Sequence, residues 1–209
     1  MKLYFSPGAC SLSPHIVLNE LGLPFQVERV DTKNNKTASG RTYSEITPKG
    51  AVPALELDNG QVLTEGAVIV QYLADLKPEK KLLPPAGSFE RVRAQEWLNY
   101  IATDIHKGFG PIFGAARLVQ NAEGQSQLKA NAKDALGKRF DYISERLGSS
   151  PYLLGSDFSV LDAYLFTVLN WSNYVELDLS RWPKLTAYME RVKSRESTKK
   201  ALQAEGLNK

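Results

Sequence analysis

The sequence has a single cysteine, Cys10, among its 209 residues. One cysteine excludes an intrachain disulfide, so the fold must be stabilised by burial of apolar side chains, which suits a reducing compartment. Cys10 stands where a short apolar run gives way to a helical pattern, in the stretch PGACSLSPH. A thiol with no partner in its own chain therefore needs another explanation.

Long apolar runs and an excess of one charge sign are also missing. No segment approaches the roughly 18 uninterrupted apolar residues of a membrane span, and the apolar run near the start is too short for a signal peptide. We therefore expect a cytoplasmic protein that does not enter membranes. The formal net charge of +3 is small, and acidic residues interrupt the densest basic run, 191–200, so no nucleic-acid partner is expected.

What remains is the composition of an ordinary folded protein, with 43% hydrophobic and 23% charged residues. The pattern over 2–5, 12–21 and 25–30 predicts a strand, a helix and a second strand, and a connection of this length favours parallel pairing. A weak helical segment follows at 42–46. Two short strands, 54–57 and 61–63, then flank the turn Asp58-Asn59-Gly60, and a helix is expected at 65–76. This order predicts an α/β unit of about 80 residues with a small mixed sheet.

The second half of the sequence reads as helical. Three prolines and clustered charge in 77–87 indicate a linker, and we divide the chain into domains 1–80 and 88–209 joined by 81–87. Apolar residues then recur every three or four positions, which predicts an all-α bundle. The segment 160–171 is apolar almost all round and is expected to be its buried central helix, opened by a capping box of Ser159 and Asp162. Further helices are expected from Pro183 to about 195 and towards 204.

Cys10 has two interpretations. If Ser11 is the N-cap of the first helix, the thiol lies near unpaired N–H groups and the positive end of the helix dipole, and both favour the thiolate. Cys10 and Ser13 also resemble a redox Cys-x-x-Cys site without its resolving cysteine, so that the partner of Cys10 would be a small external thiol. The alternative is a buried, inert cysteine.

Two further signals lie in the first half. Val52-Pro53 opens a strand after a turn, so this bond is either cis, exposing the backbone of Val52 to an extended ligand, or an ordinary strand start. At Thr64-Glu65-Gly66, helix amides with the Glu65 carboxylate would form a receptor for an α-amino-acid end, or Thr64 is simply an N-cap.

A fourth signal is the stretch WLNYIATDIHKGF in the helical half. On a regular α-helix, Asn99 and His106 lie about 20° apart around the axis and form one polar strip. His106 would then donate to a thiolate or a substrate, although a lone helical histidine is also a common surface residue.

These signals, in this order, resemble the cytosolic glutathione S-transferases, and within them the bacterial beta class, which carries a cysteine at the active site. The stretches that carry the resemblance span the chain: MKLYFSPGACSLSPHI, PKGAVPALELDNG, LTEGAVIVQYLAD, WLNYIATDIHKGF, SVLDAYLFTVLNW and AEGLNK. The resemblance implies a thioredoxin-like N-terminal α/β domain, an all-helical C-terminal domain, and a homodimer with an active site at each domain junction.

The resemblance also implies roles for individual residues. Cys10 matches the cysteine that faces the glutathione sulfur, and Val52, before the cis-proline Pro53, matches the residue whose backbone pairs with the cysteinyl part of glutathione. Glu65 and Gly66 match the pair that holds the γ-glutamyl end. The remaining positions are Asn99, His106 and Lys107, which line the site, Asp104, which the family contributes across the dimer interface, and Ser159 and Asp162, the family's N-capping box.

Other positions are less settled by the resemblance. Ser11 and Tyr4 lie near the place where other classes use a serine or a tyrosine to stabilise the thiolate, although Tyr4 also suits a core strand. Related sequences often carry a lysine that reaches the glycyl carboxylate of glutathione, and here that position is Asn35, with Lys33 and Lys36 nearby. Phe109, Phe113 and Trp171 are expected around the second substrate.

The expected activity is transfer of glutathione to a small hydrophobic electrophile, with glutathione as co-substrate and no metal. Its thiol would need a pKa lowered by about two units, which costs about 3 kcal/mol and is within reach of helix amides and hydrogen bonds. The first alternative is thiol–disulfide exchange or reductive dehalogenation through a mixed disulfide of Cys10. The second is a non-catalytic interaction protein on the same fold.

Overall fold

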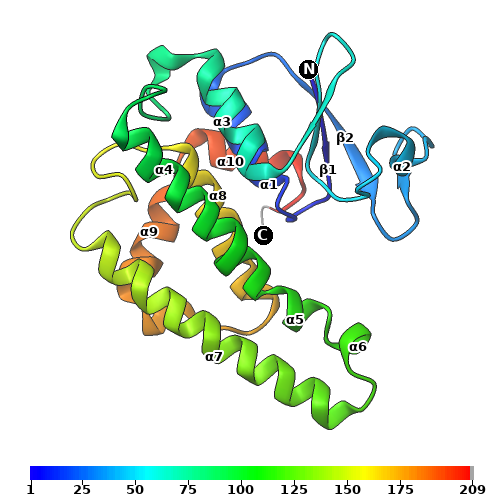
Figure 1. Ribbon diagram of the computed structural model, residues 1–209, viewed down its shortest axis with the longest axis vertical. Helices are drawn as coiled ribbons and strands as arrows, with labels where there is room; N and C mark the ends of the chain where they lie inside the picture. The colour runs from blue at the N-terminus through cyan, green and yellow to red at the C-terminus, as the bar shows by residue number, and fades with distance from the viewer. Residues whose placement is uncertain (208–209) are drawn as a thin grey trace.

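The computed structural model describes residues 1–207, so that Asn208 and Lys209, the end of the AEGLNK stretch, lie outside the described residues. An α/β part and a helical part lie side by side (Figure 1). The α/β part consists of β1 (Lys2–Phe5), α1 (Leu12–Leu21), β2 (Gln26–Asp31), β3 (Lys36–Thr37), α2 (Tyr43–Ile46), β4 (Ala54–Glu56), β5 (Val62–Thr64) and α3 (Gly66–Leu76).

The sheet has the strand order β3-β2-β1-β4-β5. β1 and β2 are parallel, with Leu3 opposite Val27, whereas the other three pairings are antiparallel. The predicted β-α-β unit and the β4–β5 hairpin are therefore confirmed. The two-residue strand β3 was not expected, because its pattern is too short to separate from a turn.

The two faces of the sheet carry separate cores because successive residues of a strand point to opposite sides. Leu3 and Leu55 face α1 and α3 and belong to a large apolar cluster. Tyr4 faces the other way and packs with Tyr43 of α2, Val30 and Ala54 in a small cluster. The sheet is thus a layer between helices, as in the thioredoxin fold, and Tyr4 is a core residue.

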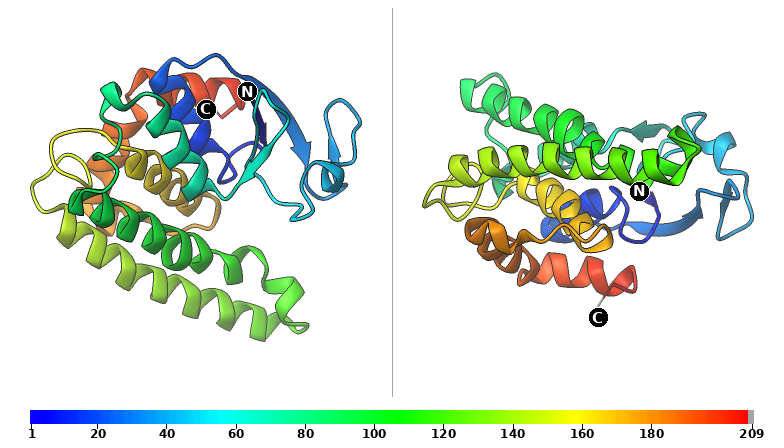
Figure 2. Two further views of the ribbon diagram at one scale, coloured as in Figure 1. Left: turned by 45° about the horizontal axis from the view of Figure 1, so that its top comes forward. Right: turned by 90° about the horizontal axis from the view of Figure 1, so that it is seen from below.

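The helical part follows the linker. Its elements are η1 (Pro78–Lys80), α4 (Phe89–Tyr100), η2 (Ile101–His106), α5 (Gly110–Phe113), α6 (Ala115–Leu118), α7 (Ala122–Leu147), α8 (Val160–Leu169), η3 (Asn170–Tyr174), η4 (Leu179–Arg181), α9 (Pro183–Lys193) and α10 (Glu196–Ala204). It forms the left side and the bottom of Figure 1, with α5 and α6 at the lower right and α10 beside α1. Every residue of α8 is buried, which confirms it as the central helix. In Figure 2, α4 and α7 form a long hairpin on one side of it.

The helix that begins at Phe89 does not stay α-helical. Ile101–His106 is a π-helix, in which each N–H bonds one residue further back than in an α-turn. The turn absorbs an extra residue, so every later side chain is rotated relative to an uninterrupted α-helix. The residues from His106 onward therefore face a different direction from the one that a regular α-helix predicts.

The two parts are joined by burial as well as by the linker. α1 packs against α3 of its own part and against α8 and α10 of the helical part. One apolar cluster runs from Leu3 to Leu202 through both parts. The expected boundaries 1–80, 81–87 and 88–209 stay a prediction. Within the described residues, no helix is both long and apolar enough to cross a bilayer.

Candidate active site

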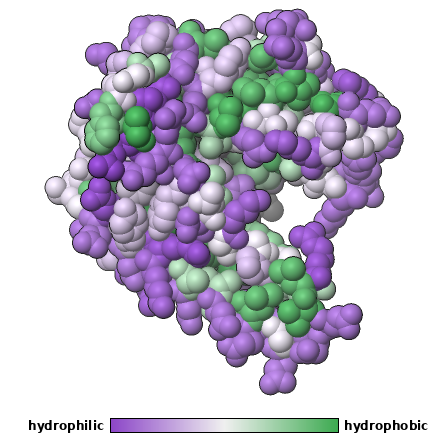
Figure 3. All heavy atoms as spheres, viewed as in Figure 1, coloured by the Kyte–Doolittle hydropathy of each residue, from purple (hydrophilic) through white to green (hydrophobic). Residues whose placement is uncertain are grey.

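Two cavities meet at the start of α1. The smaller, of about 190 Å³, is lined by residues of both parts of the molecule: Cys10, Lys49, Ala51, Val52, Pro53, Thr64, Glu65, Gly66, Ala102, His106, Lys107 and Tyr164. The larger, of about 580 Å³, is lined by Pro7, Gly8, Ala9, Cys10, Thr32, His106, Lys107, Gly110, Phe113, Arg117, Trp171 and Tyr174. In Figure 3 the surface is hollowed on the right, between the α/β part and the tip formed by α5 and α6. Cys10, His106 and Lys107 line both cavities and mark their junction.

The thiol of Cys10 is half-buried and protonated. Its Sγ donates to the backbone oxygen of Val52 at 3.0 Å. Burial raises the pKa of the Cys10 thiol to about 11, and this outweighs the opposing effect of the backbone N–H groups and of the Lys107 ammonium. The expectation that the helix end favours a Cys10 thiolate is therefore wrong for the protein without a bound ligand.

The loop before Cys10 is fixed at Gly8 by the helical part. The Gly8 N–H donates to a carboxylate oxygen of Glu205 at 2.9 Å, and its C=O accepts from the Trp171 indole at 2.7 Å. Gly8 has a φ of +71°, and a Cβ atom there would lie 3.0 Å from the Tyr174 hydroxyl. Only glycine suits both the backbone conformation and the close approach.

The extended segment 51–53, between the turn at 48–50 and β4, lines the small cavity. The Val52–Pro53 bond is cis, as the resemblance implied. The Val52 C=O accepts the Cys10 thiol, so that a ligand pairing with this segment would compete with the thiol for the same oxygen.

Glu65 lies at the N-cap position of α3 with a φ of +70°, a conformation that costs a non-glycine residue about 1–3 kcal/mol. Thr64 is the last residue of β5, so its interpretation as the helix cap is wrong. The Glu65 carboxylate is exposed and pairs with the Lys49 ammonium at 2.5 Å. The Gly66 and Ala67 N–H groups come before the first bond of this helix, which the Val68 N–H makes to the Glu65 C=O, and Gly66 lines the small cavity.

His106 enters the site from the helical part. Its Nδ1 lies 2.8 Å from the hydroxyl of Tyr164, a residue of α8. Burial lowers the pKa of the imidazole to about 4, so His106 is neutral at ordinary pH. Since a buried tyrosine hydroxyl needs an acceptor, we assign the Tyr164 proton to Nδ1, which leaves Nε2 as the N–H donor of the ring.

Three of the expected site residues do not line either cavity. Ser11 is fully buried, and its hydroxyl bonds back to the N–H and C=O of Ser6. Asp104 lies 3.8 Å from Arg139 and accepts from the Thr103 hydroxyl. Asn99 is exposed and precedes the π-turn, so the expected strip shared with His106 is not formed.

The aromatic residues expected around a second substrate lie at the larger cavity. Phe113 and Trp171 line it, with their ring centroids 5.9 Å apart. Phe109 is fully buried beneath them and contacts both rings. The Trp171 ring also stands edge-on to His106 at 4.8 Å, so the apolar wall continues to the junction of the cavities.

Sequence reasoning missed Lys49 and Tyr164, which both line the small cavity. Lys33 and Lys36, by contrast, line neither cavity. Asn35 is held away from both by a reciprocal pair of hydrogen bonds with Ser44. The signal for Lys49 was its position four residues before Pro53, in the turn that leads to β4. Among residues 1–207, no three His, Cys, Asp or Glu side chains are grouped as metal ligands would be.

Comparison with known proteins agrees with this arrangement. A family model described as "Glutathione S-transferase, N-terminal domain" matches residues 8–76, and one described as "Glutathione S-transferase, C-terminal domain" matches 126–191. Glutathione S-transferase GstA of Escherichia coli O157:H7 is 43% identical over 99% of this chain and 100% of its own length.

Two solved structures are similar over the whole chain. A bacterial beta-class glutathione S-transferase from Sphingomonas chungbukensis is 40% identical with a TM-score of 0.91, covering 99% of this chain and all of the other. A sphingomonad glutathione S-transferase complexed with glutathione is 38% identical, with the same coverage and TM-score. The chain therefore belongs to the glutathione S-transferase family and resembles its bacterial beta class from end to end.

Proposed function

We propose that the protein transfers glutathione to small hydrophobic electrophiles. The observation that carries the proposal is the meeting of two differently built cavities at Cys10, His106 and Lys107. One is bounded by Val52 and the start of α3, and the other by Phe113 and Trp171. The small cavity offers a peptide ligand the backbone of Val52, the amides at the start of α3 and the carboxylate of Glu65. The large cavity offers the aromatic wall of Phe113 and Trp171. A tripeptide in the first would hold its sulfur against an electrophile in the second. The sphingomonad relative complexed with glutathione supports the choice of tripeptide.

The protonated thiol of Cys10 suits the role of a hydrogen-bond donor. Two adjacent thiolates repel each other, so that one of the two sulfurs keeps its proton. When the cysteinyl part of glutathione pairs with the Val52 C=O, the Cys10 S–H loses its present acceptor and turns to the glutathione sulfur. The proton of the glutathione thiol passes to solvent, and the thiolate is stabilised by the Cys10 S–H, the Lys107 charge and the His106 Nε2–H.

The chemical step is a substitution at the electrophile. The glutathione thiolate forms a carbon–sulfur bond, and the halide or other leaving group departs with the electrons of the broken bond. No residue changes its oxidation state. In this scheme Tyr164 is a positioning residue, since its hydroxyl holds the His106 ring in the tautomer that donates from Nε2.

The conjugation of glutathione to 1-chloro-2,4-dinitrobenzene, followed by absorbance, tests the proposal. We expect turnover in the wild type and a reduced but measurable rate in Cys10→Ala, because the mutant loses one of several groups that stabilise the thiolate. Absence of conjugation together with failure to bind immobilised glutathione would leave the non-catalytic interaction protein as the better conclusion.

The second candidate is thiol exchange or reductive dehalogenation through a mixed disulfide of Cys10. It is favoured by one observation, the position of the Cys10 sulfur at the junction of both cavities. In exchange, the Cys10 thiolate attacks the sulfur of a glutathione disulfide, and one glutathione thiolate leaves. Loss of disulfide turnover in Cys10→Ala with surviving conjugation would assign Cys10 to exchange alone.

We also propose a cytoplasmic homodimer, as is typical of the family. Its support is the unpaired apolar surface of α4 and α7, where Phe89, Val92 and Tyr142 are exposed beside Trp97 and Tyr100. Light scattering of the purified protein tests it, since a monomer at micromolar concentration would remove the proposed role of Asp104 across the interface.

A further inference from the structure

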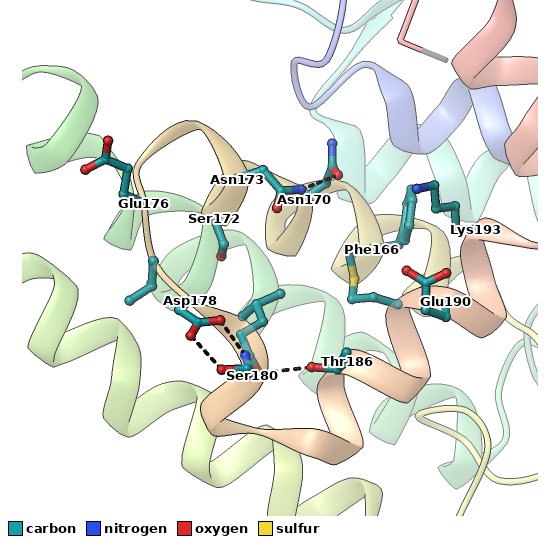
Figure 4. Close-up of a pocket in the computed structure, with 13 residues that line it drawn as sticks. Phe166, Asn170, Ser172, Asn173, Glu176, Asp178, Ser180, Thr186, Glu190 and Lys193 are labelled. Carbon is teal, nitrogen blue, oxygen red and sulfur yellow. Dashed lines mark hydrogen bonds between the residues drawn. The ribbon is translucent and has the colours of Figure 1, made fainter. Parts of the chain in front are cut away.

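A separate cavity lies behind the active site, on the other side of the short helix η3. It has a volume of about 550 Å³ and is formed by η3, η4, α8 and α9 (Figure 4). Its lining residues are Phe166, Asn170, Ser172, Asn173, Glu176, Leu177, Asp178, Leu179, Ser180, Thr186, Met189, Glu190 and Lys193. None of these residues lines the two cavities at Cys10. The volume lies within the range of small-molecule sites.

The inner wall holds a polar group without a partner. Ser172 is 1% exposed, and its hydroxyl has no hydrogen-bond partner among the described residues. Figure 4 shows its side chain pointing into the cavity. An unpaired buried hydroxyl is unfavourable, and it becomes favourable when a ligand supplies the missing donor or acceptor. Beside it, the buried side chains of Phe166 and Met189 give the wall an apolar surface.

The rim carries an excess of negative charge. Glu176, Asp178 and Glu190 stand against a single cation, Lys193. The Asp178 carboxylate accepts two hydrogen bonds from Ser180, whereas Glu176 and Glu190 have no ion-pair partner among residues 1–207. A ligand with an ammonium group would neutralise part of this charge, and an anion would be repelled.

We propose that this cavity is a second ligand site, which binds a small organic cation with an apolar body and a hydrogen-bonding group. The apolar body lies on Phe166 and Met189, the ammonium faces Glu190, and the third group pairs with the Ser172 hydroxyl. The Glu176 carboxylate points away from the cavity in Figure 4 and adds only to the negative charge of the rim. The site is independent of glutathione transfer, because it shares no side chain with the cavities at Cys10.

The chain supplies its own probe for this site. It has two methionines, Met1 at the N-terminus and Met189 in the cavity wall. Protein labelled with ¹³C at the methionine methyl groups therefore gives one signal from the site and one internal control. We expect tyramine, which has an ammonium, a ring and a hydroxyl, to shift the Met189 signal in a saturable way and to leave the Met1 signal unchanged.

Matched ligands and variants then test the two polar contacts. 4-Hydroxyphenylacetate carries a carboxylate in place of the ammonium and should bind at least about tenfold more weakly than tyramine. 2-Phenylethylamine lacks the hydroxyl and should bind the wild type more weakly than tyramine does. In Ser172→Ala, which has no hydroxyl to pair with, the two amines should bind with equal affinity.

Glu190→Gln should weaken the binding of tyramine. Glu176→Gln is the matched control, because its carboxylate points away from the cavity (Figure 4), and it should leave the binding within about twofold of the wild-type value. Unchanged Met189 signals at about 10 mM tyramine, well above a weak millimolar Kd, would overturn the proposal. Equal binding of the cation and the anion would overturn it as well.

Discussion

At the scale of single residues, the protonation of Cys10 determines which chemistry the site performs. With a pKa of about 11, only a small fraction of the thiol is ionised at neutral pH. We expect the rate of alkylation by iodoacetamide to rise about tenfold for each pH unit through the neutral and mildly alkaline range, because the thiolate is the reactive form. Mass spectrometry of the labelled protein measures this rate, and Cys10→Ser, which has no thiol, should take up no label. A rate that levels off below about pH 8 would mean that the helix end lowers the pKa of Cys10 by more than burial raises it.

Lys49 leads to a second prediction at this scale. Its ammonium is exposed in the small cavity and, within the described residues 1–207, is held only by a surface ion pair with Glu65, which is worth at most about 1 kcal/mol. It is therefore free to turn to a carboxylate of glutathione, in place of the lysine that the family often has at Asn35. We expect Lys49→Ala to raise the KM for glutathione by about tenfold with little change in kcat.

Lys33→Ala and Lys36→Ala are the matched controls, because neither residue lines a cavity. Both should leave the KM for glutathione within about twofold of the wild-type value. A fall in KM for Lys49→Ala would show the reverse role, namely that Lys49 blocks Glu65 in the free protein.

The residues that meet at the site were largely predictable, but their electrostatics were not. The motifs around Cys10, Val52, Glu65 and His106 carry the resemblance that predicted one shared site, and all four residues line the small cavity. The charge state of Cys10 depends on how much water the fold removes from it and on the acceptor that Val52 provides. Neither quantity is a property of the local sequence. The helix-end argument alone therefore predicted the wrong direction for the shift of the Cys10 pKa.

At the scale of elements, the start of α8 depends on one buried carboxylate. Asp162 is fully buried and accepts from the N–H and hydroxyl of Ser159, from the N–H of Leu153 and from the hydroxyl of Tyr188. Its removal leaves these donors unpaired in the interior. We expect Asp162→Ala to lower the free energy of unfolding by about 3 kcal/mol or more, and Ser159→Ala by about 1 kcal/mol, in urea titrations. Equal losses would mean that the contact between Ser159 and Asp162 accounts for the stability, and that the hydrogen bonds of Asp162 with Leu153 and Tyr188 add nothing.

The π-turn at 101–106 shows what an apolar pattern leaves undetermined. Leu98, Ile101, Ile105 and Phe109 are all buried, and their spacing of three or four fits an uninterrupted α-helix. The helix nevertheless contains a π-turn, which has one more residue than an α-turn. His106 therefore points in a different direction from Asn99 around the helix axis. A period of three to four residues tolerates either geometry, because it fixes the buried face only approximately. The caps and turns of α8, α9 and the β4–β5 hairpin were predictable because single residues determine them.

At the scale of the whole molecule, the two parts depend on one shared core. α1 is covered by helices from both parts, and its buried face is continuous with that of α8. The sequence indicated a linker from its prolines and charges, and it gave the order of α/β and helical parts correctly. It could not show that α10, at the far end of the chain, returns to pack on α1, because contacts between distant segments leave no local pattern.

Glu205 is where this long-range packing reaches the active site. Its buried carboxylate lies 2.9 Å from the Nδ1 of His15 and accepts the Gly8 N–H, residues that are 190 and 197 positions away. We expect Glu205→Ala to lower the free energy of unfolding by about 3 kcal/mol, because it leaves His15 and the Gly8 amide unpaired in the interior. Glu205→Gln keeps an acceptor for one of them and should lose less.

The hydrogen bond between Gly8 and Glu205 also leads to a prediction about activity, which a loss of stability alone would not explain. Gly8 begins the loop that carries Cys10, and Glu205 binds its N–H while Trp171 binds its C=O. Under conditions where Glu205→Ala is fully folded by circular dichroism, we therefore expect a higher KM for glutathione as well as a lower kcat. Glu196→Ala at the start of α10 is the control, since Glu196 is exposed and, in the part of the chain that the structure describes, pairs only with Lys199. A folded Glu205→Ala with unchanged kinetics would show that the active-site loop keeps its position without the C-terminal helix, and that the contact serves stability alone.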